Sequence, residues 1–176
     1  MAKHTSPYTP SLIASKFWED TALDDMNREQ WEAICDGCAK CCLHKFIEDD
    51  DVDDFTPTDQ PADDGHLHYT NIACYLLNDK QCACTAYLRR SELVPDCVTL
   101  TKENLDKIFF MPPSCSYRRL HEGKGLASWH PLLNKGKKSK MHLDGISVRN
   151  RTLNENDVNI ADFEDYIVTW PLDEIE

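Results

Sequence analysis

The 176-residue sequence contains no apolar run near the roughly 20 residues that an α-helix needs to cross a bilayer. Its first ten residues, Met1 to Pro10, lack the apolar core of a secretory signal peptide. Basic residues are scarce, with 19 Lys and Arg against 31 Asp and Glu, which gives a formal net charge of −12. Phosphate binding draws on clustered Lys and Arg, so this balance opposes a nucleic-acid-binding role. We therefore expect a cytoplasmic protein whose partners include neither a membrane nor a nucleic acid.

The usual catalytic signatures are also missing. The sequence has no Gly-rich phosphate loop, dinucleotide fingerprint, H-E-x-x-H pair or Ser-His-Asp order. Asp96, beside Cys97, could serve as a general base, but an Asp in a Pro-Asp turn usually fixes backbone geometry. The sequence therefore favours a binding protein, with an iron–sulfur redox protein or a metalloenzyme of unknown substrate as the alternative.

Cysteine, by contrast, is abundant. Four cysteines form a C-x2-C-x2-C-C pattern and five more follow, so that the nine are Cys35, Cys38, Cys41, Cys42, Cys74, Cys82, Cys84, Cys97 and Cys115. Two-residue gaps let one turn aim both sulfur atoms at a single point, as tetrahedral zinc or an iron–sulfur cluster requires. A disulfide framework is the other common reading, but nine is odd and no secretory signal accompanies the cysteines. We expect the cysteines to bind a metal ion.

Two short spacings limit how the ligands can be shared. Cys41 and Cys42 are adjacent and cannot easily chelate the same ion, so one can serve a second metal, bridge two metals or stay free. Cys82 and Cys84 are separated by one residue, which is too short a gap for an ordinary zinc knuckle. Either only one of them is a ligand, or the two bind different metals. Eight thiolates would suit two four-thiolate zinc sites, one polynuclear centre, or an iron–sulfur cluster beside a structural zinc.

The metal itself, zinc or iron, is left open by the spacing. Bacterial ferredoxins use C-x2-C-x2-C-x3-C-P, and this chain matches only the first three positions. An iron–sulfur cluster would have to be completed by Cys74, Cys97 or Cys115. Histidines could join the ligands, although a lone histidine is more often structural. The candidates are His44, His66, His68 and His130, of which His130 in Trp-His-Pro is the strongest.

The chain reads as one domain, residues 17–176, after a flexible lead-in at 1–16. Asn27 and Gln30 form a capping box that predicts a helix over 28–35. Residues 43–47 and 67–72 are predicted to pair as a hairpin. The insert between them, 48–65, holds nine acidic residues in eighteen and predicts a solvated loop, because acid-rich segments of low hydrophobicity rarely order themselves. A calcium site is the alternative, but the insert lacks the ligand spacing of an EF-hand.

The rest of the chain predicts short elements and many turns. We expect a short helix through Tyr87 and Leu88, a helix over 102–110, a short strand over 146–149 and a terminal helix over 162–168. The predicted fold class is α+β: a small, mostly helical, loop-rich single domain with a short β-hairpin, stapled by cysteine-bound metal. Because metal binding can supply much of the stability of a small domain, removing the metal should loosen the fold.

Several motifs together resemble one family. They are the C-x2-C-x2-C-C cluster, Thr-Asn-Ile-Ala-Cys ending at Cys74, Pro-Asp-Cys ending at Cys97, Cys-Ser-Tyr-Arg-Arg-Leu from Cys115, Trp-His-Pro-Leu-Leu from Trp129, and Gly-Ile-Ser-Val-Arg from Gly145. From about Phe17 to Arg149 the chain is similar to the YkgJ-like cysteine-cluster family, and within it to the YcgN branch. The resemblance implies chelation of zinc or iron by about eight cysteines. The ligands that the resemblance implies are Cys35, Cys38, Cys41, Cys42, Cys74, Cys97 and Cys115, together with one or both of Cys82 and Cys84. The acidic insert departs from the family's shorter loop.

Overall fold

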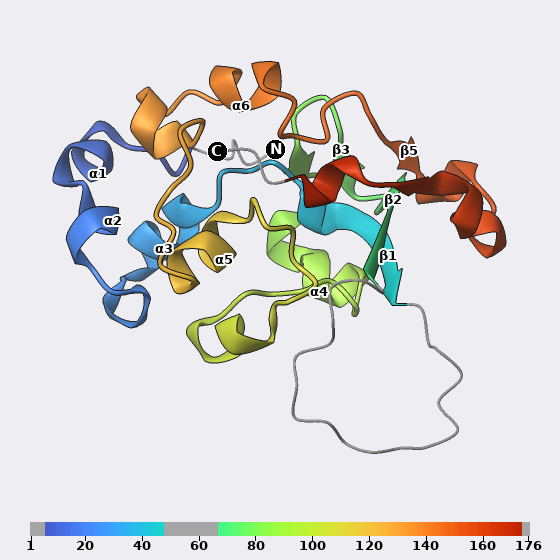
Figure 1. The fold of residues 1–176 in the computed structure, drawn as a ribbon, viewed down its shortest axis with the longest axis horizontal. Helices are drawn as coiled ribbons and strands as arrows, with labels where there is room; N and C mark the ends of the chain where they lie inside the picture. The colour runs from blue at the N-terminus through green and yellow to red at the C-terminus, as the bar shows by residue number, and fades with distance from the viewer. Residues whose placement is uncertain (1–5, 48–66, 174–176) are drawn as a thin grey trace.

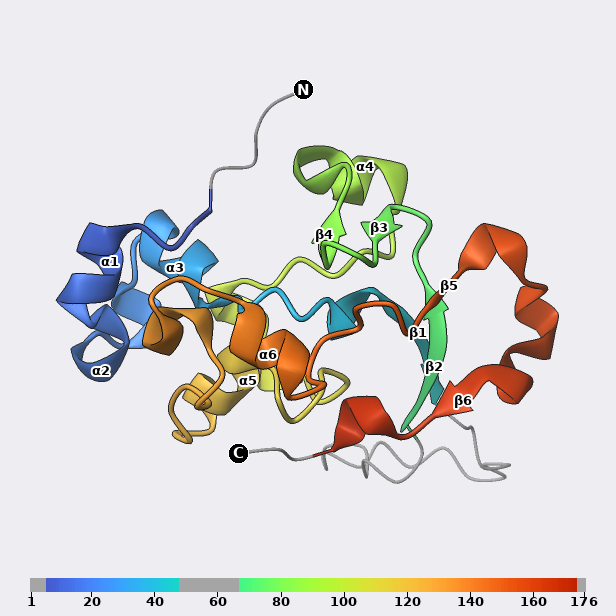
Figure 2. The same cartoon turned by 90° about the horizontal axis from the view of Figure 1, so that it is seen from above.

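A computed structural model describes residues 6–47 and 67–173, and the acidic insert at 48–65 lies outside the described residues. The N-terminal helices lie at one end of the long axis and the main sheet at the other, in both Figure 1 and Figure 2. The α-helices are short: α1 Pro10–Ser15, α2 Phe17–Asp20, α3 Arg28–Ile34, α4 Arg90–Leu93, α5 Ser116–His121 and α6 Ser139–Leu143. The mixture of short helices with two small sheets confirms the α+β class.

Further turns are 3₁₀ helices, in which backbone hydrogen bonds close one residue earlier than in an α-helix. They are η1 Leu23–Asp25, η2 Lys40–Cys42, η4 Tyr87–Arg89, η5 Lys102–Lys107, η6 Pro131–Asn134, η7 Glu155–Asp157, η8 Ile160–Tyr166 and η9 Trp170–Leu172. Short 3₁₀ segments rarely hold their shape alone, so packing and long-range contacts must fix most of this chain.

The predicted hairpin is confirmed. Strand β1, Leu43–Ile47, pairs antiparallel with β2, Leu67–Ala73, and a bulge near His44 shifts the register. Two short strands extend β2: β5, Leu153–Asn154, runs parallel to it and β6, Ile167–Val168, antiparallel. A separate hairpin joins β3, Leu77–Asn78, to β4, Ala83–Cys84. Cys84 lies on β4, where it pairs with Leu77.

Helix α3 begins where the capping box predicts. The Asn27 side chain accepts a hydrogen bond from Gln30 N at 3.0 Å, and the Gln30 side chain accepts one from Asn27 N at 2.9 Å. These two bonds satisfy backbone donors that the first turn of a helix leaves unpaired. The helix ends at Ile34, one residue before the expected end, because Cys35 takes an extended conformation. Its buried face is formed by Ala33 and Ile34.

Structure before Phe17 is more regular than expected. Helix α1 begins after Thr9, whose side chain accepts a hydrogen bond from Leu12 N at 3.3 Å. Tyr8 and Leu12 are buried in the same core as Phe17 and Ile34. The apolar side chains in this stretch therefore pack on α3 rather than forming a loose lead-in over residues 6–16.

Three further predictions of secondary structure differ from the fold. The helix expected over 102–110 is the 3₁₀ helix η5, which ends at Lys107. The prediction of a strand over 146–149 is wrong. The backbone N–H of Val148 instead donates a hydrogen bond to Cys38 O at 3.0 Å, in a segment that is not a strand. The terminal helix over 162–168 is also wrong, because η8 ends at Tyr166 and the next two residues pair with β2.

Three hydrophobic clusters meet at the segment that follows α3. Ile34 belongs to the helical cluster, Cys38 to a cluster around Trp129, and Ala39 to the cluster beneath the sheet. Figure 2 shows this segment running from the helical end towards β1. The cysteine-rich segment therefore lies at the junction of the cores.

Candidate metal centre

All nine cysteines are free thiols with different exposures. Cys38 and Cys82 are buried, Cys35 and Cys41 are exposed, and the remainder are half-buried, namely Cys42, Cys74, Cys84, Cys97 and Cys115. Burial nevertheless raises the pKa of Cys35 strongly. Both facts hold for a thiol that is surrounded by protein but keeps one accessible face.

The backbone winds tightly between Cys35 and Cys42. Gly37 and Ala39 both have positive φ angles, +72° and +64°, and a 3₁₀ turn over Lys40–Cys42 follows. A side chain at Gly37 would also meet Lys138, because a Cβ there would lie 2.1 Å from the Lys138 Nζ. Asp36 Oδ1 accepts a hydrogen bond from Cys38 N at 2.9 Å and stabilises the turn. The helix therefore ends one residue before its predicted end at Cys35, and the remaining cysteines of the pattern follow on a tight turn.

Four cysteines form what we call the α3 group: Cys35, Cys38, Cys41 and Cys115. Cys115 is the N-cap of α5, and α5 is held against α3 by Tyr117, whose hydroxyl donates to Trp31 O at 2.8 Å. The Trp31 and Tyr117 rings also pack with centroids 4.8 Å apart. This contact brings the end of α3 beside the start of α5.

Electrostatic interactions connect the members of the α3 group. The pKa of Cys35 is raised first by burial, then by Asp36 and Cys41, with Cys115 also contributing. Burial likewise raises the pKa of Cys38, with Asp36 and Cys41 adding to it. Burial is also the main reason that the pKa of Cys115 rises to about 12. In the metal-free protein these thiols are therefore protonated at neutral pH, and binding an ion must release their protons.

The other four clustered cysteines form what we call the hairpin group: Cys42, Cys74, Cys84 and Cys97. Cys74 N donates to Cys42 O at 3.0 Å at the end of the β1–β2 pair. Leu77 N donates to Cys74 O at 2.9 Å, and Leu77 pairs with Cys84 in the second hairpin. Backbone hydrogen bonds therefore connect Cys42 to Cys74, and Cys74 to the strand pair that contains Cys84.

A side-chain bond brings Cys97 to the same place. The Tyr75 hydroxyl donates to Leu93 O at 3.4 Å, and Cys97 N donates to Val94 O at 2.9 Å in the following turn. The pKa of Cys74 is raised mainly by burial, and Cys84 and Cys97 both contribute. The three thiols therefore lie close enough together to influence one another.

The two groups meet at the adjacent pair Cys41 and Cys42. A hydrogen bond between these two thiols is the largest cause of the raised pKa of Cys41. Lys45 lies at the same junction: its Nζ donates to Cys41 O at 3.3 Å and to Leu43 O at 3.1 Å. Burial lowers the pKa of Lys45, while Cys41, Cys42 and Cys97 raise it.

Cys82 stands apart from both groups. Its side chain is buried in the cluster beneath the sheet, and its Sγ donates to Asp79 O at 3.4 Å. Burial raises its pKa, and the groups that lower it are Ser147, Lys138 and Arg149. Its neighbours are therefore the apolar side chains of that cluster, with Ser147, Lys138 and Arg149 also close enough to influence the thiol.

Thiols in two groups of four match zinc or iron in kind and number. However, across residues 6–47 and 67–173, no three Cys, His, Asp or Glu side chains lie close enough to hold a metal ion as they stand. The side chains are gathered but do not form a closed coordination shell.

Histidine contributes little to the two groups. His130, the strongest candidate from sequence, is fully buried and uses both ring nitrogens: Nδ1 accepts from Leu132 N at 3.1 Å and Nε2 donates to Ile34 O at 2.9 Å. Burial lowers its pKa, which keeps the ring neutral. His68 stacks on Phe46. His66 lies outside the described residues, and His44 contacts Glu155.

Sequence reasoning missed two buried charged residues beside the α3 group. Lys40 is 1% exposed, and its Nζ donates to Ser114 Oγ at 2.9 Å and to Pro171 O at 3.2 Å. Asp36 is 3% exposed and accepts from Trp129 Nε1 at 3.4 Å. The one sequence feature that could have indicated Asp36 and Lys40 is their position between the cysteines, because their hydrogen-bond partners Trp129, Ser114 and Pro171 are distant in sequence.

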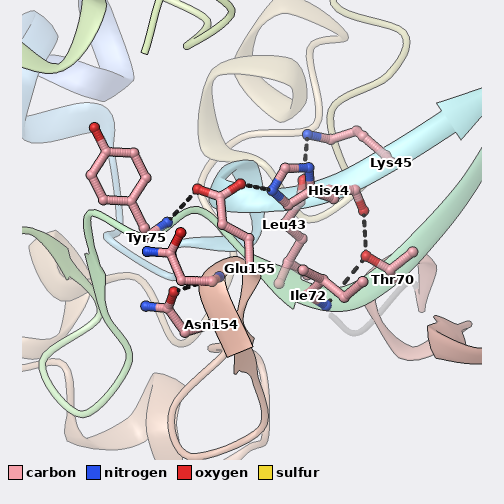
Figure 3. A network of polar contacts seen from close by, with 9 residues as sticks. Leu43, His44, Lys45, Thr70, Ile72, Tyr75, Asn154 and Glu155 are labelled. Carbon is pink, nitrogen blue, oxygen red and sulfur yellow. Dashed lines mark hydrogen bonds and ion pairs between the residues drawn. The ribbon is translucent and has the colours of Figure 1, made fainter. Parts of the chain in front are cut away.

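A second polar network supports the hairpin group (Figure 3). Glu155 Oε1 accepts from Tyr75 N at 2.7 Å, and Oε2 lies 2.6 Å from His44 Nε2. Thr70 Oγ1 donates to His44 O at 2.9 Å and secures the bulged strand. Glu155 thereby connects the C-terminal segment to the residues that follow Cys42 and Cys74.

Glu155→Ala should lower the free energy of unfolding by about 2 kcal/mol, because it removes hydrogen bonds to a charged, half-buried acceptor. Glu155→Gln keeps an acceptor for Tyr75 N and should lose less. Urea unfolding of both variants measures the difference. Asp157→Ala, an exposed change on the same 3₁₀ turn, is the matched control and should be near neutral. An equal effect from Asp157→Ala would contradict the role assigned to Glu155.

Within the part of the chain that the structure describes, no helix is both long and apolar enough to span a membrane. The cysteine-rich turn and its two thiol groups define a cysteine-cluster domain. A family model, CxxCxxCC, described as "Putative zinc- or iron-chelating domain", matches residues 34–116.

Relatives extend the match over nearly the whole chain. A UPF0260 protein of Shewanella frigidimarina is 48% identical over 93% of this chain and 100% of its own length. Another from Parvibaculum lavamentivorans is 49% identical over 89% of this chain and 93% of its length. The chain therefore belongs to the UPF0260 family. No solved structure matches it.

Proposed function

We propose that the protein binds zinc or iron through its clustered cysteine thiols, as a binding protein of a single domain that acts in the cytoplasm. The observation that supports this proposal is that contacts between distant segments bring cysteine-bearing turns together: Cys74 N donates to Cys42 O, and Tyr117 holds the start of α5, with Cys115, against α3. The matching family model, with its zinc- or iron-chelating description, supports the same chemistry.

The thiols suit such ions because thiolate is a soft ligand that prefers zinc, copper(I) or iron–sulfur clusters. When bound, the ion would supply cross-links between the helical end and the sheet. The chain's own part is to hold the thiols near one another, through the α3–α5 contact and the two hairpins. Asp36 orients the turn by its hydrogen bond to Cys38 N.

The alternative is an iron–sulfur redox protein or metalloenzyme. The exposed Cys35 and Cys41 favour it to the extent that a reactive centre needs access to a partner or substrate. A purely structural ion would not need such access.

Metal analysis with an anaerobic absorption spectrum separates these functions. Protein purified without oxygen should contain zinc or iron in stoichiometric amounts. Closed zinc sites give colourless, redox-silent protein, whereas a brown protein with acid-labile sulfide would support the iron–sulfur alternative. Protein that is folded and reduced, yet holds no metal and takes up none on incubation, would refute metal binding altogether.

A further inference from the structure

We infer that the protein carries a binding site for a phosphate-type oxyanion, formed by Lys138, His142, Ser147 and Arg149 beside the cysteine-rich turn. The site contains no thiol ligand, and its occupancy does not depend on whether the clustered cysteines hold a metal ion. Its residues belong to α6, to the N-cap of that helix and to the Gly-Ile-Ser-Val-Arg motif that follows it. The proposed function gives this motif no role.

Backbone contacts bring the two halves of the site to one place. Lys138 Nζ lies against Gly37, since a Cβ built on that glycine would be 2.1 Å from it. The next residue of the turn, Cys38, accepts a hydrogen bond at its carbonyl oxygen from Val148 N at 3.0 Å. The residues on either side of Val148 are both members of the site. The Lys138 side chain and the Gly-Ile-Ser-Val-Arg segment are therefore held at adjacent residues of the same turn.

His142 joins the site through Ser147. Its Nδ1 lies 2.7 Å from Ser147 Oγ, and Ser147 is 2% exposed. Burial lowers the pKa of His142, and Arg149 and Lys138 lower it further, so the ring is neutral at neutral pH. When the buried hydroxyl donates to Nδ1, the single proton of the neutral ring is on Nε2. In the described part of the chain, Nε2 has no hydrogen-bond partner and is available to donate to a ligand.

The two cations of the site have no counter-charge. Across residues 6–47 and 67–173, neither the Lys138 nor the Arg149 side chain makes a hydrogen bond or an ion pair. Asp144, the acidic residue at the end of α6, pairs with Lys140 instead. Two like charges that act on one half-buried ring repel each other, and a bound anion removes this repulsion. The site therefore favours an anionic ligand.

Two cations and one neutral N–H donor suit a doubly charged oxyanion. The planar guanidinium of Arg149 can donate to two oxygens of a phosphate, while Lys138 binds as a point charge. A phosphate group carries nearly two negative charges at neutral pH and offsets both cations, whereas a carboxylate offsets only one. The same dianionic group is presented by the free phosphate ion and by a phosphomonoester of a small molecule.

Calorimetric titration of the reduced protein with inorganic phosphate tests the site. Phosphate should bind saturably, and Lys138→Met or Arg149→Met should each weaken binding about tenfold, because each variant removes a charge-assisted hydrogen bond. Lys137→Met, an exposed lysine next to Lys138, is the matched control and should bind as the unaltered protein does. Equal weakening in Lys137→Met would overturn the site in favour of diffuse attraction. Metal lost from Lys138→Met would overturn it too, since that lysine would then serve the thiols.

Nitrogen NMR of the histidine rings tests the intact protein without a variant. Phosphate should shift the Nε2 resonance of His142 and leave that of the exposed His121 unchanged. Glycerol phosphate distinguishes the two sources of the ligand: tighter binding than inorganic phosphate indicates a phosphomonoester, and equal binding indicates the free ion. Acetate that binds as tightly as phosphate would overturn the preference for a dianion. Protein that binds none of these anions would overturn the site while leaving the proposed metal binding intact.

Discussion

Removal of the metal should abolish the cooperative thermal unfolding transition of this protein. The longest α-helix described has seven residues and several strands have two, whereas isolated helices shorter than about 12–15 residues are marginal in water. Structural zinc contributes roughly 10–16 kcal/mol of apparent binding free energy in small peptides. An ordinary domain has a net stability of only about 5–15 kcal/mol. Metal binding is thus large enough to decide whether this fold is stable.

The test compares reduced protein before and after treatment with a strong chelator, by calorimetry and circular dichroism. The treated protein should lose its heat-absorption peak, and added zinc should restore it. Reduced conditions are required, because oxidised thiols would cross-link the chain and mimic the metal. If the transition midpoint stays unchanged after complete metal removal, the three hydrophobic clusters are sufficient to stabilise the fold without metal.

Replacing Lys40 should weaken metal binding by a factor on the order of 10 to 100. A divalent ion with four thiolates carries a net charge of about −2, and Lys40 is a buried cation beside Cys38. Its hydrogen-bond partners, Ser114 Oγ and Pro171 O, are neutral. Burial lowers the pKa of Lys40, while the nearby Cys38, Asp36 and Asp173 raise it. A unit charge nearby, at an effective dielectric constant of about 20, contributes a few kcal/mol, and 1.4 kcal/mol is a factor of ten in affinity.

Competition with a zinc-binding chelator measures this effect in Lys40→Met, which keeps most of the side-chain volume. Lys137→Met, an exposed lysine, is the matched control and should bind zinc as the unaltered protein does. Circular dichroism of the loaded variants shows whether the fold is retained. Zinc affinity equal in both variants would show that the buried cation does not offset the charge of the site.

Local features of the chain were predictable because they depend on residues close in sequence. The capping box of Asn27 and Gln30 correctly predicted the start of α3, and residues 43–47 and 67–72 were correctly predicted to pair as the β1–β2 hairpin. In contrast, the segment 146–149 has a strand-like composition but its backbone bonds to Cys38. The last strand, β6, forms only because β2 has a free edge beside it.

The sequence by itself determined that this protein carries nine thiols, four of them at spacings suited to a metal, and that a helix leads into them. Only the tertiary structure decided which thiols are neighbours. It packs Cys82 in the cluster beneath the sheet while Cys84 pairs with Leu77, and it buries Lys40 against Ser114. Such proximities arise from packing between segments far apart in the chain, such as Lys40 and Ser114, which are 74 residues apart, and spacing along the chain does not encode them.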